Sequence, residues 1–152
     1  MIDWTFELND KPISAFKTGV ISFPAFSGID EHKNKFMSAC MPAFGPIPPG
    51  TYYIFDRQTG GMSEPLRNLF SDKTDWFALY AADGKMDDET YCNKVKRGNF
   101  RLHPKGPRGI SQGCITIENI GDFLRISAML RGACQAEVPG ISLKAYGKVI
   151  VR

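Results

Sequence analysis

Short runs in which apolar and polar residues alternate, or stay apolar throughout, recur along most of the chain. Such runs predict strands, because alternation places every second side chain on one face of a sheet. The predicted strands are Trp4–Leu8, Ile13–Phe16, Gly19–Phe23, Thr51–Phe55, Trp76–Ala81, Asn99–His103, Cys114–Ile117 and one or two strands within Ile141–Val151. The Gly19–Phe23 strand is expected to end at Pro24.

Helical spacing appears clearly in one place, after the last of the central strands. Its apolar positions are Phe123, Ile126 and Leu130. This spacing puts the three side chains on one face of a helix, with Asp122 or Asn119 as the cap and Gly132 as the end. A second, short helix is predicted at Leu66–Phe70.

Length and composition fit one folded domain. A chain of 152 residues buries roughly two-thirds of the surface that it exposes when unfolded. Hydrophobic residues at 43% and charged residues at 23% are ordinary globular values. With no repeat, linker or low-complexity segment, we expect a single β-rich α+β domain over residues 1–152, with one or two short helices.

A turn-rich loop with three glycines and two prolines joins His103 to Cys114. Each residue lies at the end of a predicted strand, so the loop can bring imidazole and thiol face to face. A cysteine nucleophile needs this partner, because the thiolate is the reactive form and a histidine can take its proton. Gly113 would let the backbone N–H groups of Gln112, Gly113 and Cys114 turn towards a developing oxyanion.

These residues also have ordinary structural interpretations. A cysteine is most often a small buried apolar group, and a histidine often holds a loop by hydrogen bonds. We expect the buried apolar state for Cys40, Cys92 and Cys134, although one disulfide among them stays open. His32 lies in a polar run and is expected to be exposed and uninvolved.

The charged residues indicate a function only in one segment of the chain. The net charge of +3 fits an anionic or zwitterionic partner but is too small to indicate nucleic acid. Six Lys and Arg fall between Lys94 and Arg108 with no acidic residue among them. They form either a solvated loop or a positive rim that lowers the pKa of Cys114 and receives substrate carboxylates. The acidic run Asp87–Glu89 is assigned to a solvated loop or a helix N-terminus.

Neither a metal site nor a membrane segment is expected. The cysteines show no C-x-x-C pattern and no paired histidine spacing, so we expect no metal and no cofactor. No segment approaches transmembrane length, and charged residues interrupt every apolar run of the first thirty residues. We therefore expect no membrane insertion and no export by the usual N-terminal route.

Two motifs carry a family resemblance. H-P-x-G-P-x-G-x-S-x-G-C-I, from His103 to Ile115, resembles the His…Ser-x-Gly-Cys signature of L,D-transpeptidases, cysteine enzymes that rebuild bacterial peptidoglycan. R-G-N-F-R-L-H-P and S-Q-G-C-I-T-I are more similar still to a compact branch, the type VI secretion L,D-transpeptidase effectors, toxins injected into a competitor. P-x-G-x-Y-x-I at Pro48–Ile54 resembles the turn and strand that precede the catalytic half.

The resemblance implies an L,D-transpeptidase-like β-sandwich with Cys114 as nucleophile and His103 as acid–base group. The chain departs from the wider pattern at Thr116, where an arginine is usual, so another residue has to orient the substrate. Lower-ranked candidates for substrate binding are Ser111, Arg101, Arg108 and Thr116. Papain-like and caspase layouts fit less well, because they place the two catalytic residues in other orders or spacings.

The resemblance also implies substrate and partners. Peptidoglycan tetrapeptide stems would lose the terminal D-alanine from diaminopimelate through a thioester, with hydrolysis or exchange of D-amino acids following. Type VI machinery would deliver the protein to the target-cell periplasm, and a periplasmic immunity protein would protect its siblings. The alternative is a non-catalytic peptidoglycan-binding or phage-structural module of the same fold, against which an intact His/Cys pair argues.

Overall fold

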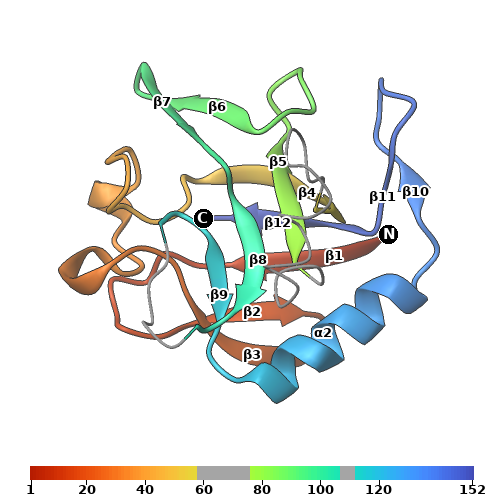
Figure 1. The fold of residues 1–152 in the computed structure, drawn as a ribbon, viewed down its shortest axis with the longest axis horizontal. Helices are drawn as coiled ribbons and strands as arrows, with labels where there is room; N and C mark the ends of the chain where they lie inside the picture. The colour runs from red at the N-terminus through yellow and green to blue at the C-terminus, as the bar shows by residue number, and fades with distance from the viewer. Residues whose placement is uncertain (58–75, 107–111) are drawn as a thin grey trace, which may run out of the picture.

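The computed structural model describes residues 1–57, 76–106 and 112–152, and the helix predicted at Leu66–Phe70 lies outside these ranges. Within them, eight strands close into a barrel in the order β1-β12-β4-β5-β8-β9-β3-β2 (Figure 1). One α-helix and two short 3-10 turns accompany the barrel in the described ranges. The prediction of a mainly β fold with one or two short helices is confirmed.

The barrel strands are β1 (Ile2–Phe6), β2 (Ser14–Thr18), β3 (Ile21–Phe26), β4 (Gly50–Asp56), β5 (Phe77–Ala81), β8 (Arg101–Pro104), β9 (Ile115–Ile117) and β12 (Gly147–Val151). Two small sheets lie outside it, β6 (Glu89–Cys92) with β7 (Val95–Gly98) and β10 (Ala136–Glu137) with β11 (Lys144–Ala145). The remaining elements are the turns η1 (Asp30–His32) and η2 (Phe36–Ser38) and the helix α2 (Ile120–Gly132). Each predicted strand corresponds to one of these, but β3 continues through Pro24, and the sequence did not predict β6, β7 or β10.

The closed sheet differs from the expected sandwich. The last strand, β12, inserts between β1 and β4 and runs parallel to β1, pairing Ile2 with Gly147 and Phe6 with Val151. Closing the sheet in this way leaves its strands paired on both sides and removes exposed edges. The alternating pattern could not distinguish the two layouts, because both bury one face of every strand.

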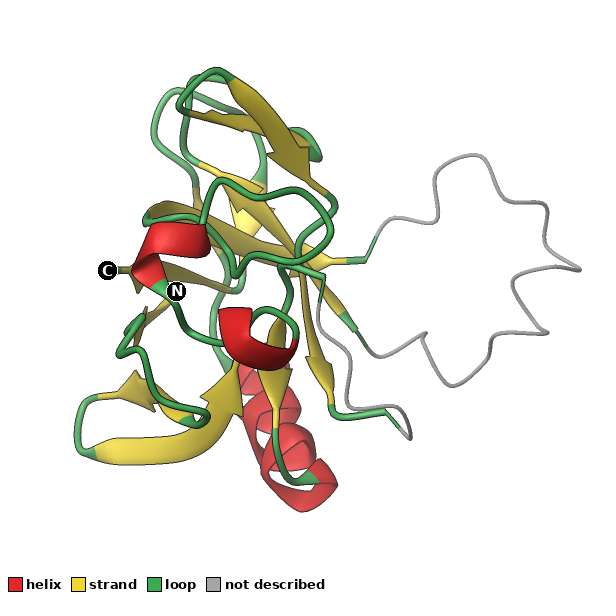
Figure 2. Ribbon diagram, turned by 90° about the vertical axis from the view of Figure 1, so that its left-hand side faces the viewer, coloured by secondary structure: helices red, strands yellow, loops and turns green. Residues whose placement is uncertain are grey.

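Aromatic side chains fill much of the barrel core, and α2 covers one side of it. Trp4 of β1 stacks on Phe16 of β2 with ring centroids 4.4 Å apart. The helix adds its predicted apolar face, Phe123, Ile126 and Leu130, to the same buried cluster. Asn119 is the residue before the first turn, but its side chain donates to the carboxylate of Asp122 instead of capping a backbone N–H. The helix lies against β8, which carries His103, and against β9, which follows Cys114 (Figure 1). Figure 2 shows the helix beside the strands from a second direction.

A disulfide between Cys40 and Cys92 joins the loop after η2 to the end of β6, with the two Cα atoms 5.2 Å apart. The expectation that these two cysteines are buried thiols is therefore wrong, and Cys134 is exposed instead of buried. The pairing depends on two segments 52 residues apart in sequence. It ties the β6–β7 hairpin to the barrel, a contact that the sequence pattern did not indicate.

Reducing this disulfide, or changing Cys92→Ser, is expected to lower the free energy of unfolding by about 4 kcal/mol. The crosslink closes a long loop, and opening that loop returns conformational entropy to the unfolded chain. Urea unfolding with and without dithiothreitol measures the difference. Cys134→Ser, which touches only an exposed thiol, serves as the control; equal stability of the oxidised and reduced protein would contradict the prediction.

Candidate active site

Strands β8 and β9 lie side by side and run parallel, which brings the two halves of the predicted site together. Their register pairs Leu102 with Ile115 and His103 with Thr116. Leu102 and Ile115 are fully buried in the core cluster, so His103 and Thr116 project from the opposite face. Cys114 directly precedes β9 and falls on the same side as Thr116, because side chains alternate. His103 and Cys114 thus occupy diagonally related positions on one face of the β8–β9 pair.

Hydrogen bonds at both ring nitrogens hold the imidazole of His103. Nδ1 lies 2.8 Å from the carbonyl oxygen of Pro104. A carbonyl can only accept, so Nδ1 carries the proton and Nε2 keeps its lone pair in the neutral ring. Nε2 lies 3.4 Å from Oγ1 of the fully buried Thr116, a long contact that another donor can replace. The ring is therefore held in the tautomer that a general base acting through Nε2 requires.

A stack of flat groups supports the ring. The indole of Trp76 lies on His103 with ring centroids 4.2 Å apart and planes 18° from parallel. The guanidinium carbon of Arg57 lies 5.5 Å from the centre of the Trp76 ring. Arg57 and Trp76 come one step beyond the pairing of Asp56 with Phe77 between β4 and β5, so the barrel register brings them together. Stacking of this kind restricts rotation of the imidazole without using either nitrogen.

The thiol of Cys114 lies 3.9 Å from the carbonyl oxygen of Asn99, to which it can donate. Burial raises the pKa of this thiol; a backbone hydrogen bond from Arg101 and the positive charges of Arg101 and Arg57 oppose the shift but are smaller. The expectation that a positive rim lowers the pKa of Cys114 is therefore wrong in its net direction, because desolvation outweighs the charges. Desolvation of this site therefore favours the neutral thiol over the thiolate.

The residue before Cys114 makes a turn that only glycine fits. Gly113 has a φ of +87°, and a Cβ atom there would lie 2.7 Å from Nη2 of Arg97 and 2.9 Å from Cε1 of Phe100. Arg97 is only 5% exposed. Its guanidinium donates to the backbone carbonyls of Ala39, Gly45 and Pro46. The Gly113 turn therefore rests on a fixed, buried cation.

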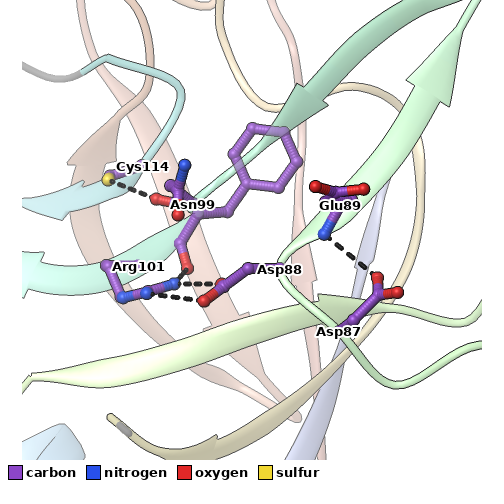
Figure 3. Close-up of polar contacts among 7 residues, drawn as sticks. Asp87, Asp88, Glu89, Asn99, Arg101 and Cys114 are labelled. Atoms are coloured by element: carbon purple, nitrogen blue, oxygen red, sulfur yellow. Dashed lines mark hydrogen bonds and ion pairs between the residues drawn. The ribbon is translucent and has the colours of Figure 1, made fainter. Parts of the chain in front are cut away.

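Arg101, a candidate for substrate orientation, is held by an ion pair. Its two terminal nitrogens donate to the carboxylate of Asp88 at 2.6 and 3.0 Å, and one of them also donates to the carbonyl of Phe100 (Figure 3). The Arg101 side chain is only 13% exposed, so its charge acts mainly within the protein. The acidic run is only in part the solvated loop that we expected: Asp87 and Asp88 lie in a loop and Asp87 is exposed, but Asp88 forms this pair and Glu89 begins β6. Sequence alone could not pair charges from separate strands.

A cavity of about 510 Å³ opens beside Cys114. The β6–β7 hairpin lines one wall, and Pro42, Ala43, Gln112 and Cys114 line the others. Its volume lies within the range of pockets that hold small organic ligands. Cys114 thus borders a space large enough for a small organic ligand.

A protein-family model described as the Tlde1 domain matches residues 21–141, which include β8, β9 and the residues that line the cavity. The chain belongs to the Tlde1 family. This is the family of type VI L,D-transpeptidase effectors, so the resemblance drawn from the two motifs is confirmed. No curated protein and no solved structure matches the chain.

Membership of the Tlde1 family implies a type VI effector of the L,D-transpeptidase type that acts on peptidoglycan. It also implies delivery by the type VI machinery towards the periplasm of a target cell. Among the residues that the structure describes, no helix is long and apolar enough to span a bilayer. The same residues contain no cluster of three or more His, Cys, Asp or Glu side chains suited to a metal ion.

In this Tlde1 domain the predicted site residues fall into two groups. Cys114, His103 and Thr116 share one face of the β8–β9 pair, and Gln112 and Gly113 form the turn that leads into Cys114. Ser111 and Arg108 lie outside the described residues. The catalytic, oxyanion-binding and substrate-binding roles assigned to these residues stay predictions.

Sequence reasoning missed the groups that position His103. The carbonyl of Pro104 leaves no signal in a sequence, because every residue has one. Arg57 had no predicted role, and Trp76 was assigned only to a strand. His32 is only partly exposed, and its Nδ1 lies 2.9 Å from Oγ of Ser38; its lack of involvement in the chemistry stays a prediction.

Gly113→Ala is expected to lower turnover about 10²-fold in this Tlde1 domain while the barrel stays folded. The added methyl group has to displace either the turn or the guanidinium of Arg97, and a misplacement of about 1 Å at a reacting centre has a cost of this size. Gly140→Ala is the matched control, because Gly140 has a φ of +80° but no atom within 4 Å of the added carbon. Equal activity of both variants would show that the close packing of Gly113 against Arg97 and Phe100 does not affect turnover.

Proposed function

We propose that this Tlde1-family protein is a cysteine acyltransferase that cleaves the bond between diaminopimelate and the terminal D-alanine of tetrapeptide stems. The observation that carries the proposal is the parallel β8–β9 pair. Its register relates the positions of His103 and Cys114 diagonally, and the contact between Nδ1 of His103 and the carbonyl of Pro104 supports a general base acting through Nε2. The family contributes the substrate class, peptidoglycan.

The first half of the reaction forms a thioester. Sγ of Cys114 attacks the carbonyl carbon at the L-centre of diaminopimelate while Nε2 of His103 takes the thiol proton. The tetrahedral intermediate then expels D-alanine, whose amine receives that proton from the imidazolium. Because burial raises the pKa of Cys114, proton removal belongs to the attack itself and not to a resting ion pair.

Charge on the intermediate has to be stabilised by the turn before Cys114. Backbone N–H groups of Gln112, Gly113 and Cys114 are the proposed donors, and the positive φ of Gly113 gives the turn its shape. The buried guanidinium of Arg97 beneath Gly113 adds a positive potential on that side.

The second half of the reaction breaks the thioester. Attack by water releases the tripeptide and makes the protein an L,D-carboxypeptidase. Attack by the amine of a D-amino acid, or of a second stem, makes it a transpeptidase. In both cases His103 takes a proton from the incoming nucleophile and the thiol of Cys114 recovers it.

The damage would occur in the periplasm of the target cell, because peptidoglycan lies outside the inner membrane. Shortened stems cannot be cross-linked through their lost residue, so the wall would weaken. A producer exposed to its own siblings would need an immunity protein that covers the cavity beside Cys114. We propose such a periplasmic partner as part of the same function.

Incubation of the purified protein with tetrapeptide muropeptides, followed by mass spectrometry, tests the proposal. The expected products are tripeptides, and stems with an exchanged last residue when a D-amino acid is added. Cleavage of glycan strands or of the D,D-bond of pentapeptides would place the protein in another class of enzyme. Binding of muropeptides without any product would favour the non-catalytic module.

A further inference from the structure

The cavity beside Cys114 carries charges of both signs on the wall formed by the β6–β7 hairpin. Asp88 and Glu89 line it at the start of β6, and Lys96 and Arg97 line it from β7. Two of these four side chains are bonded to other groups of the protein: Asp88 pairs with Arg101, and Arg97 donates to backbone carbonyls. Glu89 and Lys96 pair across the hairpin, with Oε1 and Nζ 2.7 Å apart.

The ion pair between Glu89 and Lys96 contributes little to the stability of the fold. The side chains of Glu89 and Lys96 are 52% and 60% exposed, and an exposed ion pair adds little to folding stability because water screens it. Glu89 can therefore leave Lys96 for a positive group of a ligand, and Lys96 can leave Glu89 for a negative one, with little loss of folding stability. The backbone beneath Glu89 is held, because its N–H donates to the carboxylate of Asp87 at 3.0 Å (Figure 3).

The ionised groups of the proposed substrate explain why the cavity needs both signs. The amines of a stem peptide are consumed in amide bonds, except the one at the D-centre of the diaminopimelate side chain. That ammonium is bonded to the same carbon as a carboxylate, whereas the other ionised groups of the stem are carboxylates alone. A cavity for carboxylates would be lined by cations only; Glu89 beside Lys96 matches the one group that carries both charges.

We infer that Glu89 and Lys96 form a subsite for the ammonium-and-carboxylate head group of the diaminopimelate residue whose carbonyl Cys114 attacks. The inference rests on the proposed function and adds how the acyl donor is selected. Glu89 accepts from the ammonium and Lys96 donates to the carboxylate, each by a charge-assisted hydrogen bond. Fixing the far end of the side chain orients the L-centre carbonyl towards Sγ. This chain needs such a contact because Thr116 stands where L,D-transpeptidases usually have the arginine that orients the substrate.

Three tetrapeptides separate the two contacts: the native one, one with the D-centre amine acetylated, and one with lysine in place of diaminopimelate, which lacks the carboxylate. Glu89→Gln is expected to lower kcat/KM for the native peptide about 10-fold and to leave the acetylated peptide unaffected. Lys96→Met is expected to have the same effect on the native peptide and none on the lysine peptide. Asp3→Asn and Lys148→Met remove a second exposed ion pair, outside the cavity lining, and should change nothing.

Equal losses with all three peptides, or no loss with the native one, would overturn the inference, provided that melting temperatures show folded variants. A loss confined to D-amino-acid exchange, with hydrolysis intact, would overturn it in favour of a site for the acceptor amine. If the wild-type protein turns over none of the peptides, the proposed function fails by itself. Dissociation constants of the three peptides with Cys114→Ala protein then decide the subsite, with the same pattern of losses expected.

Discussion

Cys114→Ala is expected to reduce the release of D-alanine from tetrapeptides by at least about 10⁴-fold, the usual consequence of removing a covalent nucleophile. The melting temperature should hardly change, because the side chain is small and partly exposed and is not in a disulfide. Mass spectrometry of the products measures turnover. Cys134→Ala, which removes an exposed thiol, is the matched control and should keep full activity.

The same substitution should remove toxicity. The wild-type chain, expressed with an added periplasmic signal, is expected to swell the cells and stop growth, whereas cytoplasmic expression should be tolerated because no cross-linked wall is present there. Cys114→Ala should be harmless in both compartments. Equal toxicity from both compartments would indicate a cytoplasmic target, and a folded Cys114→Ala protein with normal turnover would end the cysteine mechanism.

His103→Ala is expected to slow turnover by about 10²–10⁴-fold, the usual contribution of a positioned acid–base group. The effect should be large here because burial raises the pKa of Cys114, so almost no thiolate forms without a base near neutral pH. Raising the pH should therefore recover part of the lost rate in His103→Ala, as hydroxide generates the thiolate. Rate profiles over pH for the two proteins measure this difference.

Two comparisons make the His103 prediction specific. His32→Ala removes the other histidine, whose contacts are with Ser38 and Phe44, and should leave turnover unchanged. The double variant Cys114→Ala/His103→Ala should be hardly slower than Cys114→Ala, because nucleophile and base act as a unit. Losses that multiply would show that His103 acts in a separate step.

The sequence determined the elements of this fold and the identity of the candidate pair. Alternation placed the barrel strands within a few residues, since a strand with one buried face needs apolar side chains at every second position. The spacing of Phe123, Ile126 and Leu130 located α2 for the same reason at a helical period. The His103–Cys114 spacing and its glycines also identified the family, because a local motif is contained in the sequence itself.

Other features depend on segments that are distant in sequence, and for them local patterns carry no information. Closure of the barrel needs β12 beside β1, and the disulfide needs Cys40 beside Cys92. Both sandwich and barrel satisfy the same alternation, so only the long-range pairing distinguishes them. The β6–β7 hairpin that lines the cavity was missed, because its strands are short, polar and largely exposed and bury no apolar face.

For the chemistry of the site, too, the sequence determined one part and the tertiary structure the other. Residue types and spacing identified Cys114 and His103, but the tautomer of His103 comes from the carbonyl of Pro104 and its orientation from stacking on Trp76. The predicted direction of the net pKa shift of Cys114 was wrong, because a count of nearby cations shows neither that Asp88 holds Arg101 nor that desolvation of the thiol outweighs the positive charges. Desolvation and charge pairing are properties of packed atoms, so only the tertiary structure decided them.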